Sequence, residues 1–331
     1  YPPDPGSQAV STIGGNVAEN AGGLRGLKYG VTRDYVMGVS FFDVEGNLVK
    51  SGSRTVKCAT GYNLTGLMVG SEGTLGVFSE IILKLIPLPA HRKAMMAVFN
   101  SLEKASEAVA AIIANRIVPA TLEFLDNFTI RAVEDFSKAG LPTDAAAMLL
   151  IEVDGAEVAL DSEVEAIQQI CHREGAREFK VATSSAEVNQ LWLARRTVIG
   201  AAGRIRPSLV LQDVTVERSL LPAMVARIVE ISEKHDLPIG VLAHAGDGNL
   251  HPLILFDARN DGDLKRVKEA EQEIFATALE LDGTITGEHG IGMTKLEYLD
   301  GQLDSTAMRV TRGLKAVFDP QNILNPGKIL V

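Results

Sequence analysis

The amino-acid sequence contains little cysteine, no long apolar run and no cluster of basic residues. Its two cysteines, Cys58 and Cys171, stand outside any Cys-x-x-Cys pair, which favours a reducing compartment and a cytoplasmic location. No run reaches the roughly 18 apolar residues that a transmembrane helix needs, so only peripheral attachment to a membrane, through a partner, is left open. Because the net charge is -10 and Lys and Arg do not cluster, a nucleic-acid-binding surface is not expected.

The 331 residues are enough for two domains, and 46% hydrophobic with 22% charged residues is an ordinary globular composition. Residues 1 to about 88 are rich in glycine and strand-like. Strands are expected there at 37–42, 48–50 and 77–86. Pro87 and Pro89 favour an extended connector, which places a domain boundary near residue 88. The chain opens at Tyr1 in the middle of a motif, so it is expected to be a piece of a longer protein.

From residue 90 onward, strand patterns alternate with helix patterns. Strands are expected at 93–99, 120–125, 148–153, 178–182, 209–216 and in the two arms of a hairpin at 239–256. Helices are expected behind Ser101 as the N-cap and at 158–172, 220–234 and 263–281. A strand joined to the next by a tight turn cannot be parallel to it, so the fold class is α+β with a mainly antiparallel sheet.

Two histidines of this hairpin are the strongest candidates for chemistry. The two arms meet at Asp247-Gly248, a dipeptide that suits a two-residue turn. Such a turn would place His244 directly opposite His251, with Cβ atoms roughly 4.5 to 5.5 Å apart and Asn249 on the same face. A single histidine in a strand is more often a packed residue, and His91, His172 and His235 are expected to be ordinary surface residues.

A carboxylate and a further histidine follow in the loop 287–292, which has glycines on either side of them. His244, His251 and Glu288 form a three-ligand set that leaves positions open for water or substrate, as catalytic metal sites do. The sequence therefore predicts a divalent metal site, with zinc as the expected ion. His289 lies beside Glu288 and is expected to be a base rather than a ligand, because adjacent residues of an extended segment point to opposite sides.

Two glycine clusters, at 11–23 and 70–77, are candidates for binding a large flat or phosphorylated ligand, because glycines allow the backbone to come close to it. The first cluster is not a G-x-G-x-x-G motif and no strand leads into it, which argues against a nicotinamide-binding Rossmann unit. Taken alone, either cluster could equally be a set of tight turns.

Six motifs stand in order along the chain: PPDPGS at 2–7, TIGGN and NAGG within 12–23, GSEGTLG at 70–76, the histidine hairpin, GEHG at 287–290 and NPGK at 325–328. Together they resemble the FAD-linked 2-hydroxy-acid dehydrogenases of the vanillyl-alcohol-oxidase type, in the branch of the glycolate oxidase D subunit and D-lactate dehydrogenase. The resemblance implies that 1–88 are the second half of an FAD-binding domain. It also implies a cap or substrate domain with the metal site at 89–290, and a segment returning to the flavin at 291–331.

The resemblance also implies roles for individual residues. The flavin would be lined by Pro3, Ser7, Gly14, Gly15, Asn16, Ala18, Asn20 and Gly23, with Gly76 and Val77 near its adenine end and Asn325 near the isoalloxazine ring. His244, His251 and Glu288 match the metal ligands, Asn249 a substrate contact and His289 the catalytic base. Arg195 would grip the substrate carboxylate through two parallel hydrogen bonds, the alternative for it being a solvated helix face.

Two departures from the family pattern bear on function. The first half of the FAD domain is absent, so the chain alone is expected to bind flavin weakly or not at all. Relatives that oxidise a dicarboxylate carry a lysine two residues before the position of Asp213, where this chain has Leu211. A second carboxylate would lack a partner there, which favours a short monocarboxylate.

The sequence therefore predicts a flavoenzyme that oxidises a small D-2-hydroxy acid, glycolate or D-lactate, to the 2-oxo acid. FAD accepts the hydride and a divalent metal orients the substrate. The electron acceptor is not identified, and partner subunits or a homodimer are both open. Two alternatives are a metal-dependent hydrolase without flavin and a non-catalytic subunit of a flavin complex.

Overall fold

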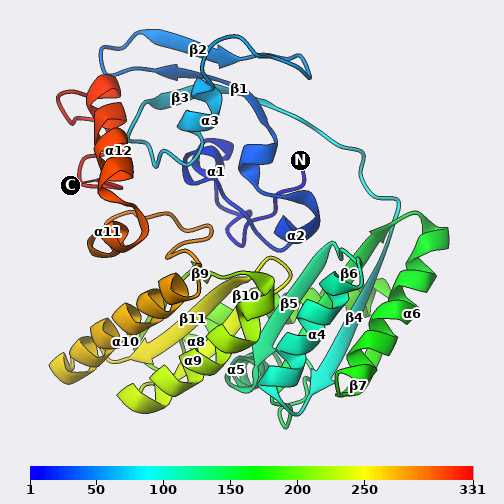
Figure 1. The fold of residues 1–331 in the computed structure, drawn as a ribbon. Helices are drawn as coiled ribbons and strands as arrows, with labels where there is room; N and C mark the ends of the chain where they lie inside the picture. The colour runs from blue at the N-terminus through cyan, green and yellow to red at the C-terminus, as the bar shows by residue number, and fades with distance from the viewer. Residues whose placement is uncertain (331) are drawn as a thin grey trace. The chain divides into compact units, whose positions relative to one another are not determined.

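The computed structural model describes residues 1–330 and divides the chain into two compact units (Figure 1). The first unit combines residues 1–87 with the segment from Ile285 onward, and the second unit is Leu88–Thr284. The expected limit after residue 290 differs from this division, which places 285–290, with Glu288 and His289, in the first unit.

The first unit contains a three-stranded antiparallel sheet in the order β2-β1-β3. The strands are β1 (Val36–Phe42), β2 (Leu48–Gly52) and β3 (Val77–Leu83). Alternate residues of β1 point to opposite faces, and Val39 and Phe41 pack against Met68 and Leu75 in a small core. Phe318, near the end of the chain, also packs against this core.

Short helices come before, between and after these strands along the chain. Only the last helix is longer than two turns. They are α1 (Ile13–Glu19), α2 (Gly26–Tyr29), η1 (Thr32–Asp34), α3 (Leu64–Met68), η3 (Leu296–Tyr298), α11 (Leu299–Gln302) and α12 (Ser305–Phe318), where η marks a 3₁₀ helix. The first glycine cluster is thus not a set of turns, because α1 forms inside it. The Thr12 side chain accepts a hydrogen bond from the Gly15 N–H at the start of α1, and Asn20 ends it at φ 53°.

The second unit is built on an eight-stranded sheet in the order β7-β4-β6-β5-β10-β11-β8, with β9 also paired to β11. Its strands are β4 (His91–Phe99), β5 (Thr121–Asp126), β6 (Ala147–Gly155), β7 (Ala176–Val181), β8 (Ser208–Leu211), β9 (Val214–Thr215), β10 (Ile239–His244) and β11 (Asn249–Phe256). Every pairing in this sheet is antiparallel, which confirms the predicted α+β class. The expected strand at 209–216 is broken at Gln212 and Asp213.

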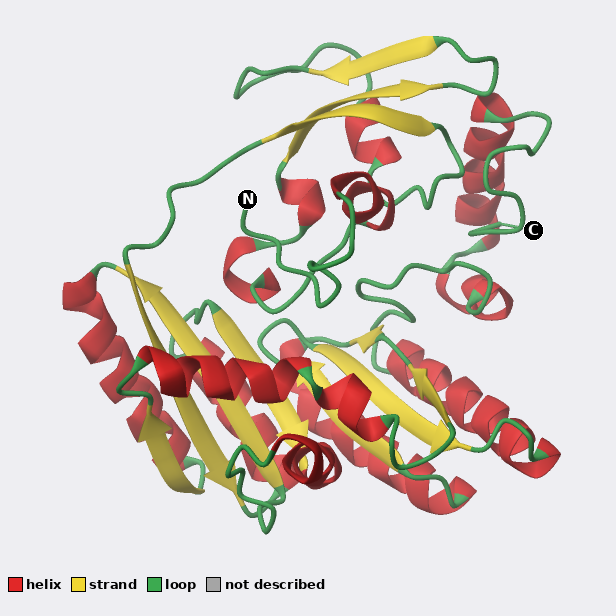
Figure 2. Ribbon diagram, turned by 180° about the vertical axis from the view of Figure 1, so that it is seen from behind, coloured by secondary structure: helices red, strands yellow, loops and turns green. Residues whose placement is uncertain are grey.

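Helices cover both faces of this sheet. They are α4 (Leu102–Ala114), α5 (Asn127–Ser137), α6 (Glu157–Arg173), α7 (Ser185–Arg196), α8 (Val198–Ala202), η2 (Arg218–Leu220), α9 (Leu221–His235) and α10 (Asp261–Glu280). Figure 1 shows α4, α6, α9 and α10 on the near face, and Figure 2 shows the helices on the other face. Ser101 accepts a hydrogen bond from the Lys104 N–H, as expected of an N-cap. No helix described in residues 1–330 is long and apolar enough to cross a membrane.

The register of the histidine hairpin differs from the prediction. His244 pairs with Asn249 and Leu242 pairs with His251, so the turn has four residues, 245–248, instead of two. The predicted direct opposition of His244 and His251 is therefore wrong. Because the shift between the two registers is two residues, and side chains alternate with a period of two, both histidines remain on the same face of the sheet.

Candidate functional site

The two hairpin histidines meet as diagonal neighbours on β10 and β11. Their ring centroids lie 5.1 Å apart and the ring planes are inclined by 87°. Both side chains are buried, with 8% of His244 and 3% of His251 exposed. The sequence prediction that these imidazoles converge is confirmed, although they do so across a diagonal of the ladder.

Each imidazole is anchored through the same nitrogen. The Nδ1 atom of His244 lies 2.7 Å from Oε1 of Glu123, and the Nδ1 atom of His251 lies 3.2 Å from the carbonyl oxygen of Gln212. A carbonyl or carboxylate oxygen can only accept, so each Nδ1 donates a proton, and in the neutral imidazole the lone pair is then on Nε2. Histidines that bind metals are held in this way, so the pair fits a divalent ion.

Glu123 connects His244 to the arginine that the sequence analysis selected. Its second oxygen, Oε2, accepts a hydrogen bond of 2.6 Å from Nε of Arg195, a residue of α7 that is only 8% exposed. Burial raises the pKa of Glu123, but His244 and Arg195 outweigh this effect and lower the pKa below its usual range. The expected alternative of a solvated helix face for Arg195 is therefore wrong.

The guanidinium of Arg195 still has donors for a ligand. Only its Nε takes part in the ion pair with Glu123, and within residues 1–330 its two terminal nitrogens donate to no other group. Since a guanidinium carries five N–H donors in a planar fork, one edge can be held by the protein while the other binds a carboxylate.

Asn249 is fixed on the same strand face and has an unused acceptor. Its Nδ2 donates a hydrogen bond of 2.9 Å to Oδ1 of Asp213, a carboxylate with no exposed surface. Its Oδ1 is buried and has no hydrogen-bond partner among the described residues. A buried acceptor left unpaired costs about 1 to 3 kcal/mol, so this oxygen fits a donor that arrives with a ligand.

In the first unit, the second glycine cluster holds the segment with Glu288 and His289. Glu72 accepts hydrogen bonds from the N–H groups of Ile291, at 2.7 Å, and Gly292, at 2.8 Å. Gly290 has φ +78°, and a Cβ there would lie 2.5 Å from Oε1 of Glu72. Glu72 has no role that its motif alone predicts, although its position between Gly70 and Gly73 is a signal that the chain comes close to it.

The first glycine cluster lies against the same segment. A Cβ on Gly22 would lie 2.7 Å from Oε2 of Glu288, so the absence of a side chain makes room for this carboxylate. The two glycine clusters are joined, since the N–H groups of Gly70 and Glu72 donate to carbonyl oxygens of α1. The glycines of the first unit therefore position the predicted ligand Glu288 and base His289.

The residues expected to line the flavin divide into two groups. Some have internal roles: Gly23 and Gly76 would clash with Asp4 and Phe41 if they carried a side chain, Asn20 accepts from the Arg33 N–H, and Asn325 donates to the Glu72 carbonyl. For the others, a contact with the flavin stays a prediction. These are Pro3, Ser7, Gly14, Gly15, Asn16, Ala18 and Val77.

Two glycines of the first cluster are not required by the packing around them. A Cβ on Gly14 or Gly15 would meet only the Thr12 hydroxyl, at 3.9 and 3.3 Å, so no internal packing demands a glycine at these two positions. The hydroxyl of the nearby Ser11 is buried and has no partner among the described residues. Both observations fit the expected approach of FAD to this backbone.

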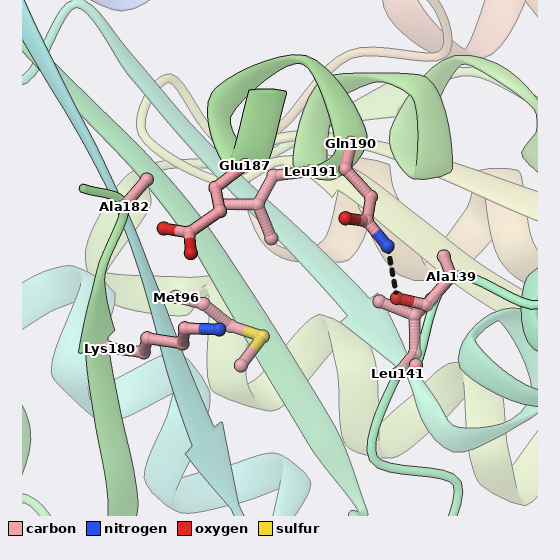
Figure 3. A pocket seen from close by; sticks show the side chains of 9 residues that line it. Met96, Ala139, Leu141, Lys180, Ala182, Glu187, Gln190 and Leu191 are labelled. Atoms are coloured by element: carbon pink, nitrogen blue, oxygen red, sulfur yellow. Dashed lines mark hydrogen bonds between the residues drawn. The ribbon is translucent and has the colours of Figure 1, made fainter. Parts of the chain in front are cut away.

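A separate hollow of about 70 Å³ lies in the second unit between the N-terminal part of α7, the strands β4 and β7, and the residues after α5 (Figure 3). Lys180 and Glu187 bring charge to it, and Met96 and Leu191 line it with apolar surface. Gln190 donates a hydrogen bond of 2.7 Å to the Ala139 carbonyl (Figure 3). None of the residues that the sequence predicted for chemistry lines this hollow.

The class of protein follows from these features and from comparison with known families. Residues 88–329 match the family of FAD linked oxidases, C-terminal domain, and residues 1–52 match an FAD binding domain. The chain belongs to this family of FAD-linked oxidases. The predicted fold class, family and FAD-dependent enzyme class are thereby confirmed, and the hydrolase without flavin is disfavoured.

Individual relatives agree with this assignment. The glycolate oxidase subunit GlcD of Bacillus subtilis is 48% identical over 329 residues, which cover 99% of this chain and 70% of that protein. The D-lactate dehydrogenase of Anaerostipes hadrus is 36% identical over 337 residues, which cover 99% of this chain and 71% of that protein. The chain spans 66–70% of the length of the glycolate oxidase subunits that it matches.

The fold has solved counterparts as well. A crystal structure of p-cresol methylhydroxylase with substrate bound matches with a TM-score of 0.76 at 15% sequence identity, over 98% of this chain and 70% of that one. At this identity the likeness concerns the fold alone. It agrees with the predicted vanillyl-alcohol-oxidase type of architecture.

Proposed function

We propose that the protein oxidises a short D-2-hydroxy acid, glycolate or D-lactate, to the 2-oxo acid. The observation that carries this proposal is the pair of Nδ1-anchored imidazoles, with Arg195 tied to one of them through Glu123. An acid with one carboxylate and an adjacent hydroxyl needs a cationic partner for the first and a metal or base for the second. The second unit supplies the cation and two ligands.

The metal would be held by His244, His251 and Glu288, and zinc is the expected ion. When bound, it would lower the pKa of the substrate hydroxyl, while FAD would supply the two-electron acceptor for the hydride from the neighbouring carbon. Glu288 belongs to the first unit and the two histidines belong to the second.

The remaining residues of the chain orient the substrate and move its proton. The open edge of the Arg195 guanidinium would bind the carboxylate with parallel hydrogen bonds. The buried Oδ1 of Asn249 would face the substrate, and Asp213 would keep this amide in place. His289 would take the hydroxyl proton, since an imidazole titrates in the range that a base needs near neutral pH.

The proposed substrate is short because of Leu211. This residue ends β8 and pairs with Leu253, so an aliphatic side chain stands where dicarboxylate-oxidising relatives are expected to carry a lysine. A second carboxylate buried there would have no cationic partner from this position. We therefore expect turnover of glycolate and D-lactate to exceed that of 2-hydroxyglutarate.

Partner subunits are part of the proposal, supported by the name of the Bacillus subtilis relative, which is a subunit of glycolate oxidase. Electrons from the flavin are then expected to pass to their acceptor through, or together with, such a partner. A homodimer is the alternative arrangement, and the mass of the purified complex separates the two.

The test of the proposed function is metal content and substrate turnover in the full-length protein. The double variant His244→Ala/His251→Ala should lose the metal and the oxidation of glycolate, measured with an artificial electron acceptor. The variant His91→Ala is the matched control, because His91 is exposed at the start of β4. A folded double variant that keeps its metal would overturn the proposed site.

A further inference from the structure

Glu123 is a buried carboxylate for which neither the sequence motifs nor the proposed reaction supplies a role. It lies on β5 in the middle of the sheet and none of its surface is exposed. Its two oxygens have different partners, since Oε1 lies 2.7 Å from Nδ1 of His244 and Oε2 lies 2.6 Å from Nε of Arg195. One side chain thus contacts both the expected metal ligand and the expected substrate arginine.

The strand register places Glu123 and His244 together. Phe124 pairs with Ala243 and Leu125 with Leu242 in the β5–β10 ladder, and the same register continued by one residue sets Glu123 opposite His244. Opposed residues of an antiparallel pair have adjacent side chains, so this contact follows directly from the sheet. Arg195 reaches the same carboxylate from α7.

Stability alone does not account for this arrangement. Taking a carboxylate and a guanidinium out of water costs several kcal/mol for each ion, and well-packed apolar residues of similar volume would often stabilise a fold as well or better. A buried ion pair with a histidine attached is better explained by the fixed geometry that it imposes. The carboxylate is planar, so its two oxygens fix the imidazole and the guanidinium relative to each other.

We propose that Glu123 is a positioning residue that couples the metal ligand His244 to the substrate-binding Arg195. This inference rests on the proposed function and deepens it. Glu123 keeps the proton of His244 on Nδ1, which leaves Nε2 as the ligand atom, and it holds Arg195 by Nε so that the other edge of the guanidinium meets the carboxylate. A single substitution at Glu123 therefore impairs metal binding and substrate binding together.

The variant Glu123→Gln tests this coupling, because glutamine keeps the size of the side chain but has only one accepting oxygen. Its amide NH₂ faces either His244 or Arg195, both of which donate. We expect zinc affinity, measured by competition with a chromophoric chelator, to fall about 10- to 100-fold, the usual effect of losing such a partner. We also expect the KM for glycolate to rise about 10-fold. This rise corresponds to a loss of about 1.4 kcal/mol in binding free energy, the size expected for one hydrogen bond.

Glu152→Gln is the matched control. Glu152 is 2% exposed on the neighbouring strand β6, and its Oε2 accepts a hydrogen bond of 2.9 Å from the indole of Trp192. The control removes an equally buried carboxylate from the same sheet, so it should leave the zinc affinity and the KM for glycolate unchanged. Equal losses in both variants would show a general structural effect and overturn the coupling.

A measurement on the unmodified protein covers the case in which Glu123→Gln does not fold. The ¹⁵N chemical shifts of histidine in the metal-free protein should show His244 protonated on Nδ1, and an Nε2–H tautomer would overturn the inference. If the wild type binds zinc and the Glu123→Gln variant has the same zinc affinity and the same KM, this inference alone is overturned. Wild-type protein without affinity for zinc would overturn the proposed metal site, and the inference with it.

Discussion

Replacing Glu72 by glutamine should loosen the segment that carries Glu288 and His289. The carboxylate of Glu72 accepts the N–H groups of Ile291 and Gly292 at 2.7 and 2.8 Å, and the side chain is only 8% exposed. These two hydrogen bonds hold the first backbone N–H groups after the GEHG motif. Their loss would act on the expected ligand and base without altering either residue.

The size of the effect follows from the two hydrogen bonds. A hydrogen bond to a charged group contributes roughly 1.5 to 3 kcal/mol. Glutamine keeps one accepting oxygen, but its NH₂ group faces the second backbone N–H, so one bond is lost and a donor is left unpaired. We expect a loss of about 2 kcal/mol in the free energy of opening this segment, which corresponds to an open population about 30-fold larger and to exchange about 30-fold faster.

Hydrogen exchange measured on a peptide that covers 287–295 tests this prediction, because exchange reports local opening directly. Glu80→Gln is the control, since Glu80 lies on β3 and its carboxylate faces Ser40 and Arg54. Exchange in the Glu72→Gln variant should speed up in this peptide and not in β4 or β6. Unchanged protection of Ile291 and Gly292 in a folded variant would refute the reasoning.

Three further predictions concern His289, Arg195 and Asp126. His289→Ala should keep metal and flavin but lose roughly 10² to 10⁴ in turnover, whereas loss of the metal with it would make His289 a ligand. Arg195→Lys should raise the KM for glycolate about 10-fold or more, because an ammonium cannot form two parallel bonds; an unchanged KM would exclude the carboxylate role. Burial raises the pKa of Asp126 from 3.8 to about 6. The proton is held more tightly in the folded state, so this contribution to stability is full below pH about 4 and is lost as pH rises through 6. The loss amounts to about 3 kcal/mol. Urea unfolding of wild type and Asp126→Asn between pH 4 and 7 should show this slope only in the wild type.

The secondary structure of the second unit could be predicted from local patterns. The apolar runs and the Ser101 cap define their elements through neighbours in the sequence. The hairpin register could not, because its turn is set by a distant segment. The N–H of Val216 donates to the Gly248 carbonyl at 3.0 Å, and a Cβ on Gly248 would lie 2.1 Å from the Val216 carbonyl oxygen. The Asp-Gly pair was a correct turn signal with an incorrect turn length.

The predicted and observed registers differ by two residues, and this difference leaves the two histidines on one face of the sheet. A slip of two residues returns every side chain to its original face, so His244 and His251 still converge. A slip of one residue would have moved one of them to the opposite face. In contrast, the helix α1 within the first glycine cluster was missed, because its stability comes from packing, with Val17 fully buried, and not from intrinsic propensity.

The residues expected to contact ligands could be predicted from the sequence. The residues that hold them in place could not. Histidines, glycines and an arginine cluster in short motifs because each motif comes from a single turn or strand end. Glu123 is separated by 72 residues from Arg195 and by 121 from His244, and Glu72 by 219 from Ile291. No local pattern distinguishes such a glutamate from an exposed one in a strand or turn. Only the fold brings each of these carboxylates to its partners. Substitution of Glu72 or Glu123 should therefore impair the site although every predicted ligand remains in the sequence.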